Sequence, residues 1–325
     1  MLKSLSFDNL WNFYNIKDIE IKPITLILGC YEGINKNNSI ISLIKFFNNI
    51  ITNKIKIKDI KKNDLTDSYF EINNDEFPTI FKFGLNFDYN ELYPIKIDIT
   101  LEIDNVFSNK INNIKYHFDY DVIEYSRDSK DLTKFNMYFN NVSYGESIIN
   151  FSGILPSHIL DNKYQEFYNM YRYISNIDYT DINITRENNE FIFNNLSTDI
   201  NLIKDPDLIY PINLHGDISD LIINKYNEIN SRKFIIESNA EVLYLRFRRR
   251  IAERELNHND VIIYIIYEDR NSYNIKPVKI DKYGDIDCWL DGLFSEDFKE
   301  VKYIRKAQRN LNLWIMKNFQ QILIW

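Results

Sequence analysis

The chain has 325 residues, of which 45% are hydrophobic and 26% are charged, and its formal net charge is −8. This length and composition predict a globular protein with one large domain or two modest ones. A membrane protein is not expected because no apolar run reaches about 18 residues, and the acidic balance argues against a protein that coats polyanions. Cys30 and Cys288 suit neither a disulfide framework nor a metal-binding spacing, so we expect a cytoplasmic protein.

In chain order, the first predicted elements are strands at 2–7, 18–21 and 24–28, followed by a helix from residue 40 to about residue 49. Apolar and polar residues alternate between Phe81 and Val142, which predicts an antiparallel meander. The second half has an α/β pattern, with helices expected at 215–229 and 240–256 and strands at 233–236, 261–267 and 274–280. We therefore expect an α/β fold with an antiparallel lobe, in one domain whose lobes span residues 1–200 and 201–325.

The strand at 24–28 leads into Gly29, a short polar loop and an apolar helix, which is the order of a phosphate-binding loop. A working loop has the pattern G-x-x-x-x-G-K-S/T, whose lysine reaches the β- and γ-phosphates. Here Ile34 stands at the second glycine position and Asn35 at the lysine position. The remaining candidates for phosphate contacts are Gly29, Gly33, Lys36, Asn37 and Ser39.

A second candidate motif lies at Leu202–Pro211, where an apolar strand end is followed by acidic residues. A Walker B strand needs one carboxylate for Mg²⁺ and another to polarise the attacking water. The first of these positions is Lys204, and Asp205 and Asp207 remain on either side of Pro206. Taken alone, the sequence D-P-D is also an ordinary turn.

The third motif is a buried strand that ends at Glu237 and turns into a helix, for which a cap is expected near Ser238 or Asn239. One face of the helix is basic. This arginine stripe consists of Arg246, Arg249, Arg250 and Arg254. It suits the phosphates of a nucleotide or a nucleic acid, and the alternative is ion pairing with nearby glutamates.

These motifs resemble, in order and spacing, the ABC-type ATPase heads of the overcoming-lysogenisation-defect and RecF-like group, which are small AAA-type ATPases of bacterial anti-phage systems. The opening LKSLSFDNLWNFYNIKDIEIKPITLILG is similar to L-x-x-L-x-I-x-N-F-x-x-F/Y-x-D-x-x-I-x-L-x-P-I-T-L-L-x-G. The stretch KDPDLIYP resembles E-E-P-E-L-H-L-H-P, and FIIESNAEVLYLRFRRRIAE resembles I-I-E-T-H-S-E-x-L-L-x-R-L-R-R-x-I-A-E. Downstream, KIDKYGDIDCWLDGLFSED resembles a tail module of one branch, I-D-x-x-G-x-I-x-x-W-P-x-G-F-F-D-E.

The resemblance implies a P-loop NTPase-like head, and it also shows which site residues depart from the family. The loop lysine is lost or displaced to Lys36, and Lys204 replaces the metal carboxylate. The catalytic glutamate becomes at best Asp205, and the switch histidine becomes Asn239. Because these groups act as a unit, losing two or more of them should leave almost no hydrolysis.

We therefore expect a degenerate ATPase that serves as a structural or regulatory subunit, without a cofactor, for an active ATPase, nuclease or toxin partner. A homodimer would be held by protein contacts. The apolar segment 312–325 is a candidate docking helix, or it packs on its own domain. Two alternatives remain: a divergent active ATPase that uses Lys36 with ATP and Mg²⁺, and a nucleic-acid-binding protein that uses the arginine stripe.

Overall fold

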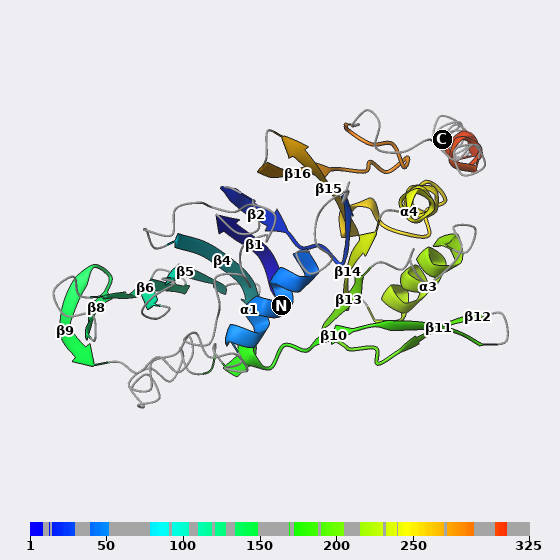
Figure 1. Cartoon of the computed structure of the whole chain (residues 1–325). Coiled ribbons are helices and arrows are strands. Elements are labelled where there is room, and N and C mark those ends of the chain that lie inside the picture. Colours follow the sequence, from blue (N-terminus) through cyan, green and yellow to red (C-terminus); the bar gives the residue numbers. More distant parts are fainter. Residues whose placement is uncertain are drawn as a thin grey trace, which may run out of the picture. The chain divides into compact units, whose positions relative to one another are not determined.

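The structure is a computed structural model of the whole chain (Figure 1). It describes residues 1–8, 13, 15–29, 40–51, 79–90, 93–103, 110–118, 121–127, 134–148, 169, 172–187, 190–204, 215–229, 232–238, 240–269, 272–288 and 303–310. The chain divides into two compact units, each made of three separate segments. The first contains residues 1–21, 31–177 and 268–274, and the second contains residues 22–30, 178–267 and 275–325.

The first unit contains an eight-stranded sheet in the order β2-β1-β4-β5-β6-β7-β8-β9. Its strands are β1 (Leu2–Asp8), β2 (Ile16–Glu20), β4 (Thr79–Asn90), β5 (Tyr93–Ile103), β6 (Lys110–Phe118), β7 (Asp121–Arg127), β8 (Lys134–Phe139) and β9 (Val142–Ile148). From β4 onward each strand pairs antiparallel with the next strand of the chain. The predicted meander is therefore confirmed.

The alternating sequence of the meander separates a buried face from a polar one. On β5, Ile95 and Ile97 are buried, whereas Lys96 and Asp98, which alternate with them, are half-exposed and form an ion pair of 3.1 Å. His117 on β6 also approaches Asp98, at 3.2 Å. This division is expected of a sheet with one face against a core and the other toward water. The same unit contains helix α1 (Ile40–Ile51), which buries Ile41, Leu43, Ile44 and Phe47, among others.

The second unit contains a six-stranded sheet in the order β10-β13-β14-β3-β15-β16. Its strands are β3 (Ile24–Gly29), β10 (Tyr179–Asp181), β13 (Ile200–Lys204), β14 (Lys233–Ser238), β15 (Val261–Asp269) and β16 (Ser272–Val278). From β10 to β15, each pair of neighbours is parallel. Every residue of β3 is buried, which is typical of an inner strand of a parallel sheet that is covered on both faces.

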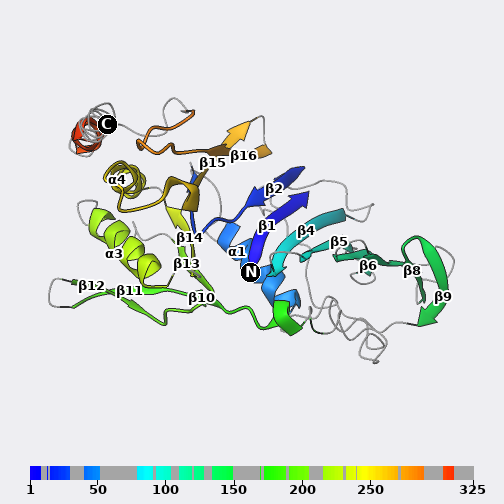
Figure 2. The same ribbon diagram turned by 180° about the vertical axis from the view of Figure 1, so that it is seen from behind.

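Two helices of the second unit, α3 (His215–Glu228) and α4 (Glu241–Ala252), pack against each other (Figures 1 and 2). Each places apolar residues four positions apart in the core, namely Ile218 and Ile222 on α3 and Leu243 and Phe247 on α4. A hairpin of β11 (Asn183–Glu187) and β12 (Glu190–Asn194) belongs to the same unit.

The predicted α/β class with an antiparallel meander is confirmed, but the two units interleave along the chain. The expected lobes, 1–200 and 201–325, follow chain order, whereas β3 from the N-terminal part joins the sheet of the second unit. The cause is its pairing with β14 on one side and β15 on the other. The candidate docking segment 312–325 lies outside the described residues.

Candidate functional site

The carboxyl ends of three motif strands meet at one edge of the parallel sheet. Lys204 at the end of β13 pairs in register with Glu237 of β14. Ser238, the last residue of β14, pairs with Leu28 of β3, and Gly29 ends β3. In open α/β sheets, ligands bind outside the carboxyl ends of the strands. We call these residues, Gly29, Lys204, Glu237 and Ser238, the strand-end site.

The polar residues at the end of β14 are buried. Glu237 is 1% exposed and Ser238 is fully buried. The Ser238 hydroxyl oxygen accepts a hydrogen bond from the backbone N–H of Ala240 at 3.0 Å, which fixes the turn from the strand into α4. The cap that was expected near Ser238 or Asn239 lies at Ala240, the N-cap of α4, and no side-chain hydrogen bond caps the helix there. Ser238 is still part of the strand, so its side chain serves the turn instead.

Lys204 and Glu237 bring opposite charges to the same register position. Register partners on adjacent strands project their side chains to the same face of a sheet. A buried carboxylate is costly unless a cation or hydrogen-bond donors compensate its charge, and Lys204 is only half-buried. The register therefore places a lysine and a buried carboxylate on the same face of the sheet.

The described residues of the strand-end site do not form a donor set for Mg²⁺. An ammonium group cannot ligate a cation, and a lysine at this register position opposes the binding of a divalent ion. Among the residues that the structure describes, no group of three or more His, Cys, Asp or Glu side chains could hold a metal ion. The position at which the resemblance implies a metal carboxylate is therefore occupied by a group of the wrong charge.

Most of the other predicted site residues follow directly in the chain from these strand ends. They lie outside the described residues: Gly33, Lys36, Asn37, Ser39, Asp205, Asp207 and Asn239. Gly29 and Lys204 belong to two of the sequence motifs, and the structure brings both to the same edge of one sheet. The motifs gave Glu237 no role, because its only signal in the sequence is a charged residue at the end of an apolar run.

The arginine stripe lies on α4, and two of its members hold one carboxylate of α3. Arg250 binds Asp220 through two bonds, Nε to Oδ1 at 2.7 Å and Nη2 to Oδ2 at 2.8 Å. Arg246, four residues earlier on the same face, donates from Nη1 to Asp220 Oδ2 at 2.5 Å. Burial acts to raise the pKa of Asp220, but the Arg250 hydrogen bond and the charges of both arginines lower it below its ordinary value. The hydrogen bond that Arg250 donates to Asp220 is also the main reason that the pKa of Arg250 is raised.

Glutamates beyond the end of α4 engage the same stripe. Arg250 Nη1 lies 3.0 Å from Glu253 Oε2 and 2.8 Å from Glu255 Oε2. Arg249 Nε donates to Glu253 Oε1 at 2.9 Å, and its guanidinium lies 4.2 Å from the ring centroid of Tyr303. Arg246, Arg249 and Arg250 thus form ion pairs within the unit, which was the alternative to phosphate binding in the sequence analysis. Asp220 was not among the expected partners.

Arg248 is not a member of the arginine stripe, and it binds the tail module, which is the segment 279–297. Its Nε donates to the Gly284 carbonyl at 2.8 Å, and its Nη1 donates to the Tyr244 hydroxyl at 2.8 Å. Gly284 has a φ of +80°, and a Cβ there would overlap the Arg248 carbonyl oxygen. A glycine is therefore required at this position of the module, because a side chain would be both strained and obstructed.

Comparisons with known proteins give a distant structural likeness only. No protein-family model matches the chain, and no curated protein matches it. An SMC head bound to the C-winged helix domain of ScpA has a TM-score of 0.40 and 11% identity, covering 86% of this chain and 98% of that one. The SMC head domain from Thermotoga maritima has a TM-score of 0.37 and 12% identity, covering 86% of this chain and 100% of that one. In the described part of the chain, no helix has the length and apolarity to span a bilayer.

Proposed function

We propose that this chain is a catalytically degenerate ABC-ATPase-like protein that acts as a structural or regulatory subunit of a bacterial complex. The observation that carries the proposal is Lys204 at the end of β13, in register with the buried Glu237 and on the same sheet as the end of β3. Resemblance to overcoming-lysogenisation-defect and RecF-like ATPases suggests that this complex belongs to anti-phage defence.

The replacement at Lys204 is informative because it reverses a charge. A Walker B carboxylate holds Mg²⁺, which neutralises the charge that develops on the transferred phosphoryl group. A lysine cannot recruit the metal, and the loop after Gly29 has Ile34 and Asn35 in place of the second glycine and the lysine. Mutational effects on groups that act as a unit are far from additive, so two such losses remove nearly all hydrolysis.

The strands that carried the chemistry in the proposed ancestor remain fully packed. Every residue of β3 is buried, and β13 and β14 are buried except for Lys204 and Lys233, which are half-buried. If turnover was lost and the packing of these strands was still selected, the folded structure itself is what the complex needs. This is the reason to favour a structural or regulatory role.

The proposed partner is a protein: an active ATPase, a nuclease or a toxin. Nucleic acid is the weaker choice because Arg246, Arg249 and Arg250 already bind carboxylates of the same unit. Releasing them to bind phosphates would leave Asp220 and Glu253 without their ion pairs. A homodimer, if formed, would depend on protein contacts instead of shared ATP.

One observation favours a second candidate, a divergent and active ATPase. The ends of the three motif strands still meet at one edge, which is where a nucleotide would bind. In this alternative, Lys36 reaches a phosphate, Asp205 or Asp207 serves Mg²⁺, and the activity is coupled to a nuclease or nucleic-acid partner.

Calorimetric titration of the full chain with ATP and Mg²⁺ separates these candidates. The degenerate protein should bind in the millimolar range or not at all, and Lys36→Ala should not change the result. Micromolar affinity that Lys36→Ala abolishes would overturn the proposal in favour of the active ATPase. Retention of partner proteins on the full chain, and their loss when residues 312–325 are deleted, would support the role as a subunit.

A further inference from the structure

A helix of residues 303–310 packs beside α4 in the second unit (Figures 1 and 2). Its inward residues are Ile304 and Ala307, which are 3% and 8% exposed. Ile304 belongs to the same core cluster as Leu243 and Phe247 of α4. We call this element the basic helix, because all of its charged residues are cations.

The outward residues of the basic helix carry three positive charges. Arg305, Lys306 and Arg309 are all exposed, and at 3.6 residues per turn they lie within about 100° of one another around the helix axis. We call them the cationic face. In the part of the chain that the structure describes, none of the three forms an ion pair. By contrast, three members of the arginine stripe on α4 bind carboxylates.

The sequence around the basic helix offers these cations no acidic neighbour. Charged side chains on one helix pair when they are three or four positions apart. Residues 301–325 contain five lysines and arginines and no aspartate or glutamate, so no carboxylate lies at such a distance from the cationic face. In a chain of net charge −8, this segment is a local reversal of charge.

The carboxylates on the elements that hold the basic helix have partners of their own. Asp285 accepts from Gln308 Nε2 at 2.9 Å and lies 3.9 Å from Arg248 Nη2. Glu253, directly after α4, lies 2.9 Å from Arg249 Nε. Neither carboxylate forms an ion pair with the cationic face among the described residues. The three cations therefore face outward with their charges uncompensated by these neighbours.

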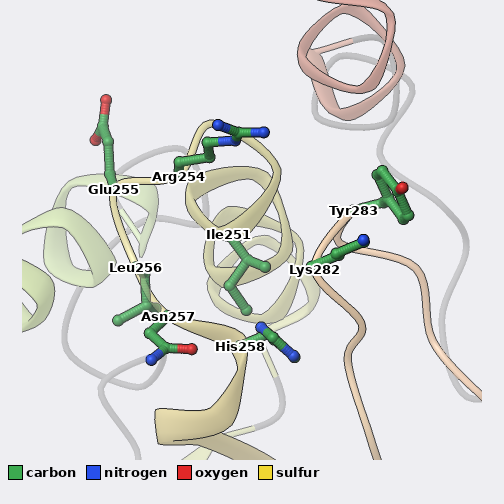
Figure 3. Close-up of a pocket in the computed structure, with 8 residues that line it drawn as sticks. All are labelled: Ile251, Arg254, Glu255, Leu256, Asn257, His258, Lys282 and Tyr283. Atoms are coloured by element: carbon green, nitrogen blue, oxygen red, sulfur yellow. The ribbon is translucent and has the colours of Figure 1, made fainter. Parts of the chain in front are cut away.

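The basic helix is held in place by side-chain contacts as well as by its apolar residues. Gln308 Nε2 donates to the Tyr283 carbonyl at 3.0 Å, and Asp281 Oδ1 accepts from the Tyr283 N–H at 2.8 Å. Figure 3 shows Tyr283 and its turn next to the end of α4. The Arg249 guanidinium lies 4.2 Å from the ring centroid of Tyr303. Because the backbone is fixed before a partner arrives, less order has to be gained on binding.

The size of the cationic face and the charge of the chain favour a protein partner over a nucleic acid. Arg305 and Arg309 are about 6 Å apart along the helix axis, which suits a few carboxylates of a short acidic segment. A nucleic acid would extend beyond the face over a protein of net charge −8, which opposes a long polyanion.

The border of the cationic face has the composition of a protein interface. Tyr303 is 44% exposed, and it precedes Lys306 by three positions, so the two are neighbours on the helix surface. Tyrosine and arginine are among the residue types that contribute most to binding between proteins. A partner that supplies carboxylates and one apolar group would match this surface.

We propose that the cationic face docks an acidic segment of the partner protein. Carboxylates of that segment pair with Arg305, Lys306 and Arg309, and an apolar group covers the exposed part of Tyr303. This inference rests on the proposed role as a subunit, and it adds the chemistry of the segment that docks. It does not depend on the state of the strand-end site.

A fluorescein-labelled deca-glutamate peptide is a suitable probe, titrated with the full chain by fluorescence anisotropy at low ionic strength, where surface charges are least screened. We expect saturable binding that the double variant Arg305→Gln/Arg309→Gln weakens about fivefold or more, because two surface ion pairs are lost. Both residues are exposed, so the fold should be retained. Lys17→Gln/Lys82→Gln is the matched control, since it removes two charges from exposed positions of the first unit.

An oligothymidylate of the same number of residues, labelled in the same way, tests the other class of partner. We expect it to bind more weakly than the peptide. The inference is overturned if the double variant has no more effect on peptide binding than its control, or if the oligothymidylate binds more tightly than the peptide.

ATP hydrolysis by the same preparations reports separately on the proposed function. Turnover together with peptide binding would overturn the degenerate active site and leave the docking face standing. Absence of both turnover and peptide binding would overturn the docking face alone.

Discussion

Lys204 and Glu237 occupy the same register position on the neighbouring parallel strands β13 and β14. Glu237 is almost fully buried, so its ionised form depends on compensation from its surroundings. In the proposed history of this chain, a lysine replaced the carboxylate that held Mg²⁺. On that proposal, the charge at this register position changed from negative to positive.

This relationship predicts an energetic coupling between the two residues. Lys204→Met should lower the free energy of unfolding by about 1–3 kcal/mol, because a buried carboxylate loses a compensating charge. In the double variant with Glu237→Gln, much of that loss should disappear, giving a coupling energy of about 1–2 kcal/mol in a double-mutant cycle. Urea denaturation of the four proteins measures it.

Lys225→Met is the control for this cycle. Lys225 is paired with the exposed Glu228 at 2.7 Å, so the same substitution should change stability by less than about 0.5 kcal/mol. Strict additivity of Lys204→Met and Glu237→Gln would show that the two charges do not interact.

Asp220 joins α3 to α4 through Arg246 and Arg250, and its removal should be costly. Asp220→Asn is expected to destabilise the protein by about 2 kcal/mol at pH 7, because two guanidinium groups lose their carboxylate. Asp217→Asn, an exposed change of the same kind in the first turn of α3, should cost only a few tenths of a kcal/mol.

The effect of Asp220→Asn should depend on pH in a defined direction. The pKa of Asp220 is lowered on folding from its ordinary value of 3.8, so its contribution is complete above that pH. It is lost as the pH falls below 3.8 through the folded pKa. Chemical denaturation at several pH values should therefore show the wild type and Asp220→Asn converging in acid. A difference that stays constant down to pH 2 would mean that the lost stability is not electrostatic.

Gly284→Ala should disrupt the attachment of the tail module to α4. The positive φ and the overlap of a Cβ with the Arg248 carbonyl both oppose the substitution, with an expected cost of about 2 kcal/mol or more. Hydrogen exchange should report the loss locally, as faster exchange of the Tyr283 and Asp285 amides. Lys282→Ala, at the exposed neighbouring turn position, should leave their protection unchanged. Equal protection in Gly284→Ala would contradict this account of the turn.

Asn201 is a buried polar residue that supports β13 from within the sheet. Its Oδ1 accepts from the Ser197 N–H at 2.8 Å, and its Nδ2 donates to the carbonyls of Ser197 and Lys233, each at 3.2 Å. Asn201→Ala should cost about 2–3 kcal/mol, because these backbone groups lose their partner. Asn194→Ala removes an exposed hydrogen bond to Thr185 and should cost less than about 1 kcal/mol by thermal or urea denaturation. Equal losses of stability in the two variants would mean that the burial of Asn201 does not increase the contribution of its hydrogen bonds.

The sequence predicted the elements well because their periodicity is local. Alternation in β5 marks one buried face, and the unbroken apolar run of β3 marks an inner parallel strand. The contacts between elements were not predictable in the same way. Asp220 meets Arg250 across 30 positions of the chain, and no local pattern pairs them. The interleaving of the two units depends likewise on the long-range register of β3 with β14.

The candidate site shows the same limit. The motifs identified Gly29 and Lys204, but the closeness of Lys204 to Glu237 follows only from the register of β13 with β14. Serine is a common residue at helix N-caps, but Ser238 is the last residue of β14, so it does not cap α4. The sequence thus predicts which residues carry charge, and the fold decides which charges meet.

Steady-state ATP hydrolysis by the full chain in the presence of Mg²⁺ tests the central claim most directly. The account predicts no phosphate release above the protein-free blank, and no change in Lys36→Ala. Magnesium-dependent turnover that copurifies with the chain and disappears in Lys36→Ala would contradict it, because it would show that the strand-end site still performs the chemistry we infer to have been lost.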